Sequence, residues 1–132
     1  MSSGARVLVT GGAGYLGGII VPILLDQGYS VTVLDNFMFK QNPLATACIS
    51  PNFSIFKGDA RDKRLVKELL KTADVILPLA ALVGAPLCAQ DPIGAESTNL
   101  DGQLMLLNET SPSQKILMPI TNSGYGVGEN GK

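Results

Sequence analysis

The residues with the clearest chemical use are three glycines at three-residue spacing, Gly11, Gly14 and Gly17, which follow the apolar run 6–9. Gly11 permits a tight turn, Gly14 lets the backbone approach a phosphate group, and Gly17 lets the next helix pack closely on the strand. The helix N-terminus adds unpaired N–H groups and a partial positive charge. The spacing therefore predicts a turn that binds a pyrophosphate. An ordinary strand-to-helix turn is the alternative.

Two carboxylates stand where a dinucleotide needs polar contacts. Asp35 ends an apolar stretch eighteen residues after Gly17, where an acidic residue binds the hydroxyls of the adenosine ribose. A carboxylate there repels a 2′-phosphate, so NAD is favoured over NADP, with nearby Lys40 keeping NADP as the weaker alternative. Asp59 ends the next apolar stretch and could accept a hydrogen bond from the adenine amino group. For both carboxylates the alternative is a turn or capping aspartate.

The composition excludes several other kinds of chemistry. The 132 residues contain no histidine and two cysteines, Cys48 and Cys88, so neither a metal site nor a disulfide framework is expected. Cys88 has no histidine to activate it and is expected to be buried or incidental. The net charge of −1, without a basic patch, argues against nucleic acid as a partner. No signal peptide or membrane span is predicted, and a cytoplasmic location is expected.

Apolar stretches alternate with helical patterns along the whole chain. The predicted strands span 6–9, 30–34, 53–56, 74–81 and 115–120, and the predicted helices span 14–27, 62–71 and 93–109, with a shorter helix at 44–49. Gly28 should end the first helix and Asp62 should cap the second. Pro78 should lie near the end of its strand, because a central strand needs its N–H donors. The segment 81–91, rich in small residues, is predicted to be a loop.

This alternation predicts one α/β domain over residues 1–132, a Rossmann-type, doubly wound parallel sheet. The expected strand order is 3-2-1-4-5, with the ligand at the switch point beside the first strand. A flavodoxin-like fold that binds no dinucleotide is the third and blandest hypothesis.

The motifs together resemble the extended short-chain dehydrogenase/reductase family, nearest to its NAD-dependent epimerases and dehydratases of nucleotide sugars. The resemblance is carried, in order and at matching spacing, by residues 9–17, 34–36, 58–59, 79–81, Asn99 and 122–126. It covers the N-terminal, cofactor-binding part of such enzymes.

The resemblance implies a role for each matching residue. It implies NAD contacts from the turn and from the ends of the strands, at Gly11, Gly14, Tyr15, Leu16, Gly17, Asp35, Asn36, Asp59, Ala60, Leu79, Ala80, Ala81, Val83 and Asn99. It implies a catalytic role for Thr121, which would hydrogen-bond the oxygen of the substrate where hydride is transferred. It also implies a nucleotide-sugar substrate and a homodimer for the whole protein.

One departure from the family pattern limits the expected activity. The family's base is a tyrosine followed four residues later by lysine, which lowers its pKa. Tyr15, Tyr29 and Tyr125 are instead followed at that spacing by isoleucine, valine and glutamate. We therefore expect a fragment cut after the fifth strand, inactive by itself, of an enzyme that takes hydride from a sugar carbinol. A non-catalytic dinucleotide-binding or redox-sensing module is the alternative.

Overall fold

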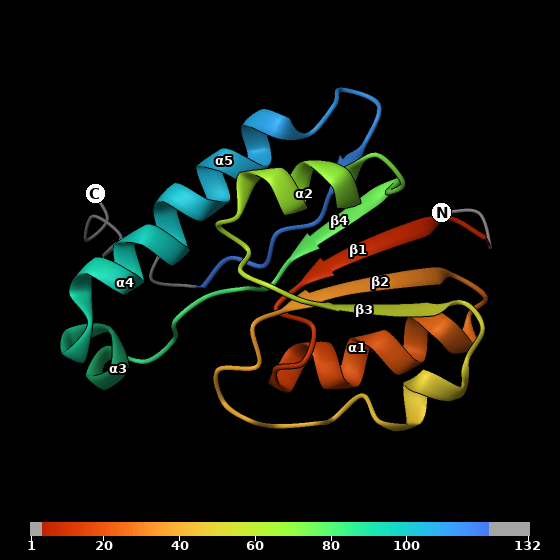
Figure 1. The fold of residues 1–132 in the computed structure, drawn as a ribbon, viewed down its shortest axis with the longest axis horizontal. Helices are drawn as coiled ribbons and strands as arrows, with labels where there is room; N and C mark the ends of the chain where they lie inside the picture. Colours follow the sequence, from red (N-terminus) through yellow and green to blue (C-terminus); the bar gives the residue numbers. More distant parts are fainter. Residues whose placement is uncertain (1–3, 122–132) are drawn as a thin grey trace, which may run out of the picture.

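A five-stranded parallel sheet with strand order β3-β2-β1-β4-β5 organises the chain (Figure 1). The computed structural model describes residues 4–121. The strands are β1 (Arg6–Thr10), β2 (Ser30–Asp35), β3 (Phe53–Lys57), β4 (Val75–Pro78) and β5 (Lys115–Ile116). The predicted order is confirmed. The flavodoxin-like alternative is excluded because that fold has the order 2-1-3-4-5.

Helices cover both faces of the sheet (Figure 1). One face carries α1 and the 3₁₀ turn η1, and the other carries α2 and α5. The bounds are α1 (Tyr15–Asp26), η1 (Thr46–Ile49), α2 (Lys63–Leu70), α3 (Ala85–Gln90), α4 (Pro92–Glu96), the π-helical turn η2 (Ser97–Asp101) and α5 (Gly102–Glu109).

The alternation of side chains along β1 explains why the sheet is covered on both faces. Val7 and Val9 lie in the apolar cluster under α1, whereas Leu8 lies in the cluster under α2 and α5. All three side chains are buried. A parallel strand buried on both faces has no polar side, which is why the segment is continuously apolar.

Three local expectations are confirmed. Gly28 follows α1 with a φ of +83°, the left-handed conformation that ends a helix at low steric cost. The Asp62 carboxylate caps α2 by accepting hydrogen bonds from the N–H groups of Arg64 (3.0 Å) and Leu65 (3.1 Å). Pro78 is the last residue of β4.

β5 is shorter than the predicted strand 115–120, and Pro78 gives the reason. The N–H of Leu117 donates to the carbonyl oxygen of Ile76 at 2.9 Å. The next donor along this parallel ladder would be residue 78 of β4. Proline has no N–H, so the pairing stops after Ile116. β4 itself ends at Pro78 instead of reaching residue 81, because its register with β1 runs only to Thr10, the last residue of that strand.

Two further expectations are wrong in detail. The predicted loop 81–91 contains the short helix α3. Pro86 lies in the first turn of this helix, a position that suits proline. The predicted helix 93–109 is divided into α4, η2 and α5, with a π-helical turn between its two α-helical parts. The motif at residues 122–126 lies outside the described residues.

Candidate functional site

A cleft of about 450 Å³ lies at the carboxyl ends of the strands. It is walled by the turn after β1, the ends of β2 and β3, and the loop after β4. In an open α/β sheet ligands bind at this edge, where strand order reverses on the two sides of β1. Every cofactor contact predicted from the sequence lines this cleft except Asn99.

The glycine turn forms the wall beside β1. Gly11 has a φ of +70°, and a Cβ atom built on it would lie 2.6 Å from the backbone of Ala80. A Cβ atom on Gly17 would collide with the backbone of Gly12. Both glycines are therefore required by close approach of backbone to backbone, as the spacing predicted.

The first turn of α1 opens into the cleft. Its N-cap is Gly14, with no side-chain cap and no acidic residue in the first turn. Gly14, Tyr15 and Leu16 all line the cleft. The N–H groups at a helix start have no partner within the helix, so this end offers donors and a partial positive charge to an anion.

Asp35 has two backbone partners and acceptor capacity to spare. Its Oδ2 accepts from the N–H of Ala13 at 2.9 Å, and its Oδ1 accepts from the N–H of Phe37 at 2.7 Å. An ionised carboxylate offers about four acceptor positions. The side chain thus holds the glycine turn to the end of β2 and can still accept hydrogen bonds from a ligand in the cleft.

Asp59 has a different surrounding, because it is paired with Arg61. Arg61 Nη2 lies 2.6 Å from Asp59 Oδ2, and the backbone N–H of Arg61 donates to Oδ1 at 2.8 Å. These hydrogen bonds hold the pKa of the Asp59 carboxyl below its ordinary value. The bond from the backbone N–H of Arg61, two residues further along the chain, is that of a turn aspartate, the alternative that the sequence left open for Asp59.

The loop after β4 is held by side chains from the helical segment behind it. The amide of Asn99, in η2, both donates to the carbonyl oxygen of Leu82 and accepts from its N–H, each at 2.8 Å. Gln103 Nε2 donates to the carbonyl oxygen of Ala80 at 2.9 Å. Asn99 does not line the cleft. In the structure Asn99 supports the loop, and its predicted contact with the cofactor stays a prediction.

Several residues that line the cleft had no signal in the sequence. They are Phe37, Met38, Phe39, Gln41, Arg61, Asp91, Gly94 and Thr98. The first four follow β2 in a segment without periodicity. Its backbone includes left-handed conformations at Phe37 (φ +57°) and Lys40 (φ +52°), a feature that residue types do not reveal. Lys40 itself does not line the cleft.

The remaining candidates lie apart from the cleft. Thr121, predicted as catalytic, is exposed and is not among the residues lining it. Cys88 is half-buried, and its Sγ donates to the carbonyl oxygen of Leu82 at 3.3 Å. Within residues 4–121 no cluster of acidic and cysteine side chains could hold a metal ion. Within the same residues, no helix has the length and apolar character needed to cross a membrane.

The cleft fits an extended dinucleotide. Its volume is in the range of small-molecule sites. Helix N–H groups for a pyrophosphate, a carboxylate with free acceptor capacity for a ribose, and small side chains at Ala80 and Ala81 all face it. The polar groups thus match the parts of a dinucleotide.

Comparison with known proteins gives a family match over nearly the whole chain. The model of the NAD dependent epimerase/dehydratase family matches residues 7–131. A UDP-N-acetyl-alpha-D-glucosaminuronate decarboxylase of Bacillus cytotoxicus is 32% identical over 124 residues, which are 93% of this chain and 38% of that protein. The chain therefore spans less than half the length of this relative.

Solved structures agree with the family match. One is a UDP-glucose 4-epimerase from Bifidobacterium longum in complex with NAD⁺ and UDP, with a TM-score of 0.80 and 28% sequence identity. The match covers 92% of this chain and 38% of the epimerase chain. Another is a dTDP-glucose 4,6-dehydratase from Bacillus anthracis in complex with NAD, with a TM-score of 0.79 and 26% sequence identity. The match covers 97% of this chain and 41% of the dehydratase chain. The predicted cofactor NAD is thus confirmed at the level of the family.

Proposed function

The chain belongs to the NAD-dependent epimerase/dehydratase family, and from this premise we propose that it is the NAD-binding part of a nucleotide-sugar epimerase or dehydratase. The observation that carries the proposal is the cleft itself. One hollow at the switch point of the sheet is walled by the glycine turn, Asp35 and the Ala80–Ala81 backbone. These groups come from β1, β2 and β4, so the tertiary fold is what brings them together.

Each wall has a proposed task. The N–H groups of Tyr15 and Leu16 would bind the pyrophosphate, since they open α1 without a side-chain cap, whereas the N–H of Gly14 already donates to the carbonyl oxygen of Gly11. Asp35 and Asn36 would bind the adenosine ribose. The loop Leu79–Val83 would lie along the nicotinamide ribose, where its small side chains permit close approach.

The charges in the cleft support NAD over NADP. Asp35 would repel a 2′-phosphate at the ribose it binds. Among the described residues that line the cleft, Arg61 is the one cation, and it is paired with Asp59. An Arg that already holds a carboxylate is a poor partner for a phosphate, so no compensating charge is available.

The reaction proposed for the whole protein is transient oxidation of a sugar. NAD would supply the hydride acceptor for a sugar carbinol and return the hydride, giving an epimer or, after loss of water, a dehydrated product. Thr121 would donate a hydrogen bond to the reacting sugar oxygen. The sequence contains no tyrosine followed four residues later by lysine. We therefore expect no turnover from this chain alone.

An apolar helix surface is the proposed site of a homodimer in the whole protein. Leu100, Leu104 and Leu107 are exposed, and they recur at helical spacing along η2 and α5. A second copy would cover them.

Titration calorimetry with NAD and NADP tests the proposal. We expect the 132-residue chain to bind NAD at least about tenfold more tightly than NADP, a difference of about 1.4 kcal/mol. Asp35→Asn should narrow this ratio, because it removes the charge that repels the 2′-phosphate. Asp26→Asn, an exposed position at the end of α1, should leave it unchanged. Absence of NAD binding by the unmodified chain would overturn the proposal.

The non-catalytic module stays as the second candidate, favoured by the missing tyrosine–lysine pair. A redox sensor must bind NADH and NAD with different affinities. Calorimetry with both forms separates the candidates. Unequal affinities would favour the sensor, and equal affinities would favour the enzyme part.

A further inference from the structure

Gln103 belongs to α5, behind the loop that follows β4, and it is not among the residues that line the cleft. We propose that Gln103 is a positioning residue, which holds the backbone of Ala80 in place and thereby raises the affinity for the nicotinamide half of the dinucleotide. This inference rests on the proposed function, because it concerns the loop that would lie along the nicotinamide ribose.

The loop leaves the sheet between two fixed points. The N–H of Leu79 donates to the carbonyl oxygen of Thr10 at 2.9 Å, which continues the ladder between β4 and β1. Further along the chain, the amide of Asn99 bonds both backbone groups of Leu82. Ala80 lies between these two points and lines the cleft. The path of the backbone at Ala80 therefore shapes this wall.

Gln103 supplies a hydrogen bond at this place. Its Nε2 donates to the carbonyl oxygen of Ala80 at 2.9 Å. The glycine turn meets the same residue, since a Cβ atom built on Gly11 would lie 2.6 Å from the Cα and N atoms of Ala80. Ala80 is thus in contact with the glycine turn and is also bonded to α5. A shift of its carbonyl group would move this wall of the cleft relative to the pyrophosphate-binding turn.

The amide of Gln103 is a poor choice for the stability of the fold alone. Its Oε1 is buried and has no hydrogen-bond partner among the described residues. Burying a polar atom without a partner costs free energy, and this cost offsets much of the gain from the one bond to Ala80. Methionine has a similar length and carries no such cost. The fold therefore gains little from the amide, whereas the position of the Ala80 carbonyl group depends on it.

The effect of Gln103 should be confined to one half of the ligand, because the glycine turn has its own bonds to β2. The N–H of Gly11 donates to the carbonyl oxygen of Leu34 at 2.8 Å, and the N–H of Ala13 donates to Asp35 at 2.9 Å. These bonds hold the groups proposed for the pyrophosphate and the adenosine ribose, whatever the loop does. Release of Ala80 should therefore weaken only a ligand that extends as far as the loop.

Calorimetry with NAD and with ADP tests the proposal. ADP contains the adenosine and the pyrophosphate but lacks the nicotinamide ribose and its ring. In Gln103→Met the loop must be ordered again when the ligand binds, so we expect NAD to bind about fivefold more weakly, with ADP within about twofold of its affinity for the unmodified chain. Asn108→Met, at an exposed position of the same helix, should change neither affinity.

The melting temperature is followed in parallel, and Gln103→Met should stay within about 5 °C of the unmodified chain. Gln103→Asn keeps the test decisive if Gln103→Met does not fold. Its amide ends one methylene short of Ala80, so it should weaken NAD and spare ADP in the same way. Loss of folding in both variants would overturn the inference, since the amide would then be needed for the fold.

The remaining outcomes separate this inference from the proposed function. Unchanged NAD affinity in a folded Gln103 variant would overturn the inference alone. Equal weakening of NAD and ADP would also overturn it, because Gln103 would then support the whole cleft and not the nicotinamide side. Absence of NAD binding by the unmodified chain would overturn the proposed function and this inference together.

Discussion

The two ends of the parallel sheet carry hollows of similar size but different polar chemistry. The cleft at the carboxyl ends measures about 450 Å³, and a hollow at the amino ends, beside Arg6 and Gln114, measures about 500 Å³. Volume alone therefore does not identify the functional site. The two ends differ in whether their polar groups already have hydrogen-bond partners within the protein.

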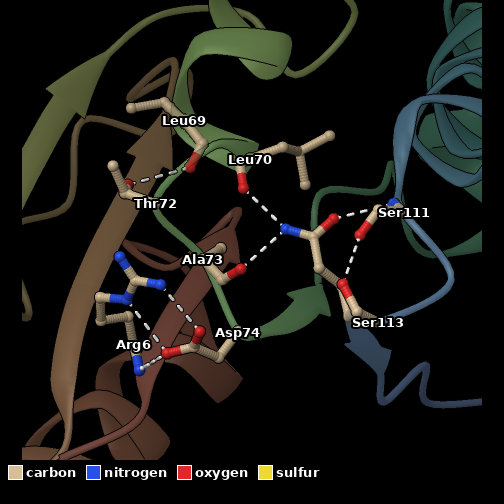
Figure 2. Close-up of polar contacts among 9 residues, drawn as sticks. Arg6, Leu69, Leu70, Thr72, Ala73, Asp74, Ser111 and Ser113 are labelled. Atoms are coloured by element: carbon tan, nitrogen blue, oxygen red, sulfur yellow. Dashed lines mark hydrogen bonds and ion pairs between the residues drawn. The ribbon is translucent and has the colours of Figure 1, made fainter.

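At the amino ends the polar groups are matched to one another. Gln114 Nε2 donates to the carbonyl oxygens of Leu70 (2.6 Å) and Ala73 (2.7 Å), while its Oε1 accepts from the N–H of Ser111 (2.9 Å). Figure 2 shows these bonds meeting at one side-chain amide, beside the paired Arg6 and Asp74. Such a network ties α2 to the start of β5 and leaves little for a ligand to bind.

At the carboxyl ends several groups lack partners. Thr10 Oγ1 and Gln103 Oε1 are buried without a hydrogen-bond partner among the described residues. The first turn of α1 has no cap, and Asp35 retains acceptor capacity. An unsatisfied polar group destabilises a fold and is an expected feature of a ligand site. Thr10 and Gln103 do not line the cleft, whereas the first turn of α1 and Asp35 do, and these two groups are the ones that the proposed function assigns to the ligand.

The largest expected effect is at Gly11, where the cleft depends on backbone contact. Gly11→Ala would place a Cβ atom 2.6 Å from Ala80 in a backbone with a φ of +70°. We expect it to lower the free energy of unfolding by about 3 kcal/mol and to abolish NAD binding. Gly4→Ala, with a φ of +97° but nothing within 4 Å, should cost about 1 kcal/mol. Equal costs in urea unfolding would show that close packing at Gly11 is unimportant.

An effect of intermediate size is expected from replacing two glutamines, one at each end of the sheet. Gln114→Met leaves two carbonyl groups and one N–H without their partner, so we expect a loss of about 2 kcal/mol in stability. Gln103→Met removes one bond and an unpaired oxygen, so it should cost about 1 kcal/mol or less. Gln114→Met should leave NAD affinity unchanged, measured by calorimetry. The proposed division of roles fails if it weakens NAD binding more than Gln103→Met does.

The smallest effect is a pH dependence at the amino ends. Hydrogen bonds from the Arg6 side chain and backbone lower the pKa of Asp74 from 3.8 to about 2. Because the folded pKa is the lower one, the stabilisation is present above pH 3.8 and is lost as the pH falls toward 2. Asp74→Asn should therefore reduce the drop in melting temperature between pH 5 and pH 2, while Asp26→Asn should not. NAD affinity at neutral pH should be the same in both variants.

The fold was predictable because its signals are local. Continuous apolar strands, the helix end at Gly28 and the cap at Asp62 each depend on a few neighbouring residues, and all three are confirmed. The length of β5 was not predictable from its own residues. The ladder stops where Pro78 of the adjacent strand offers no N–H, and that residue lies far away in the sequence.

The candidate site divides in the same way. Residue type and spacing identified Gly11, Gly17 and Asp35, because a tight turn and an acidic strand end are properties of short segments. The sequence also included Asn99, whose amide the structure places on the backbone of Leu82. It gave no sign that Arg61 lines the cleft, because that side chain is held there by hydrogen bonds to Asp59 and Ser97.

The sequence by itself determined the order of the elements, the position of the glycine turn and the family to which the chain belongs. Periodicity, glycine spacing and strand ends are enough for these, since each is a short-range pattern. Only the tertiary structure decided from which donors each carboxylate accepts. Asp35 and Asp59 both end strands of the same sheet, but one bonds two separate backbone groups and the other is enclosed by one arginine. Hydrogen-bond capacity is used up by whichever donors the fold brings near, and residue type does not specify those donors.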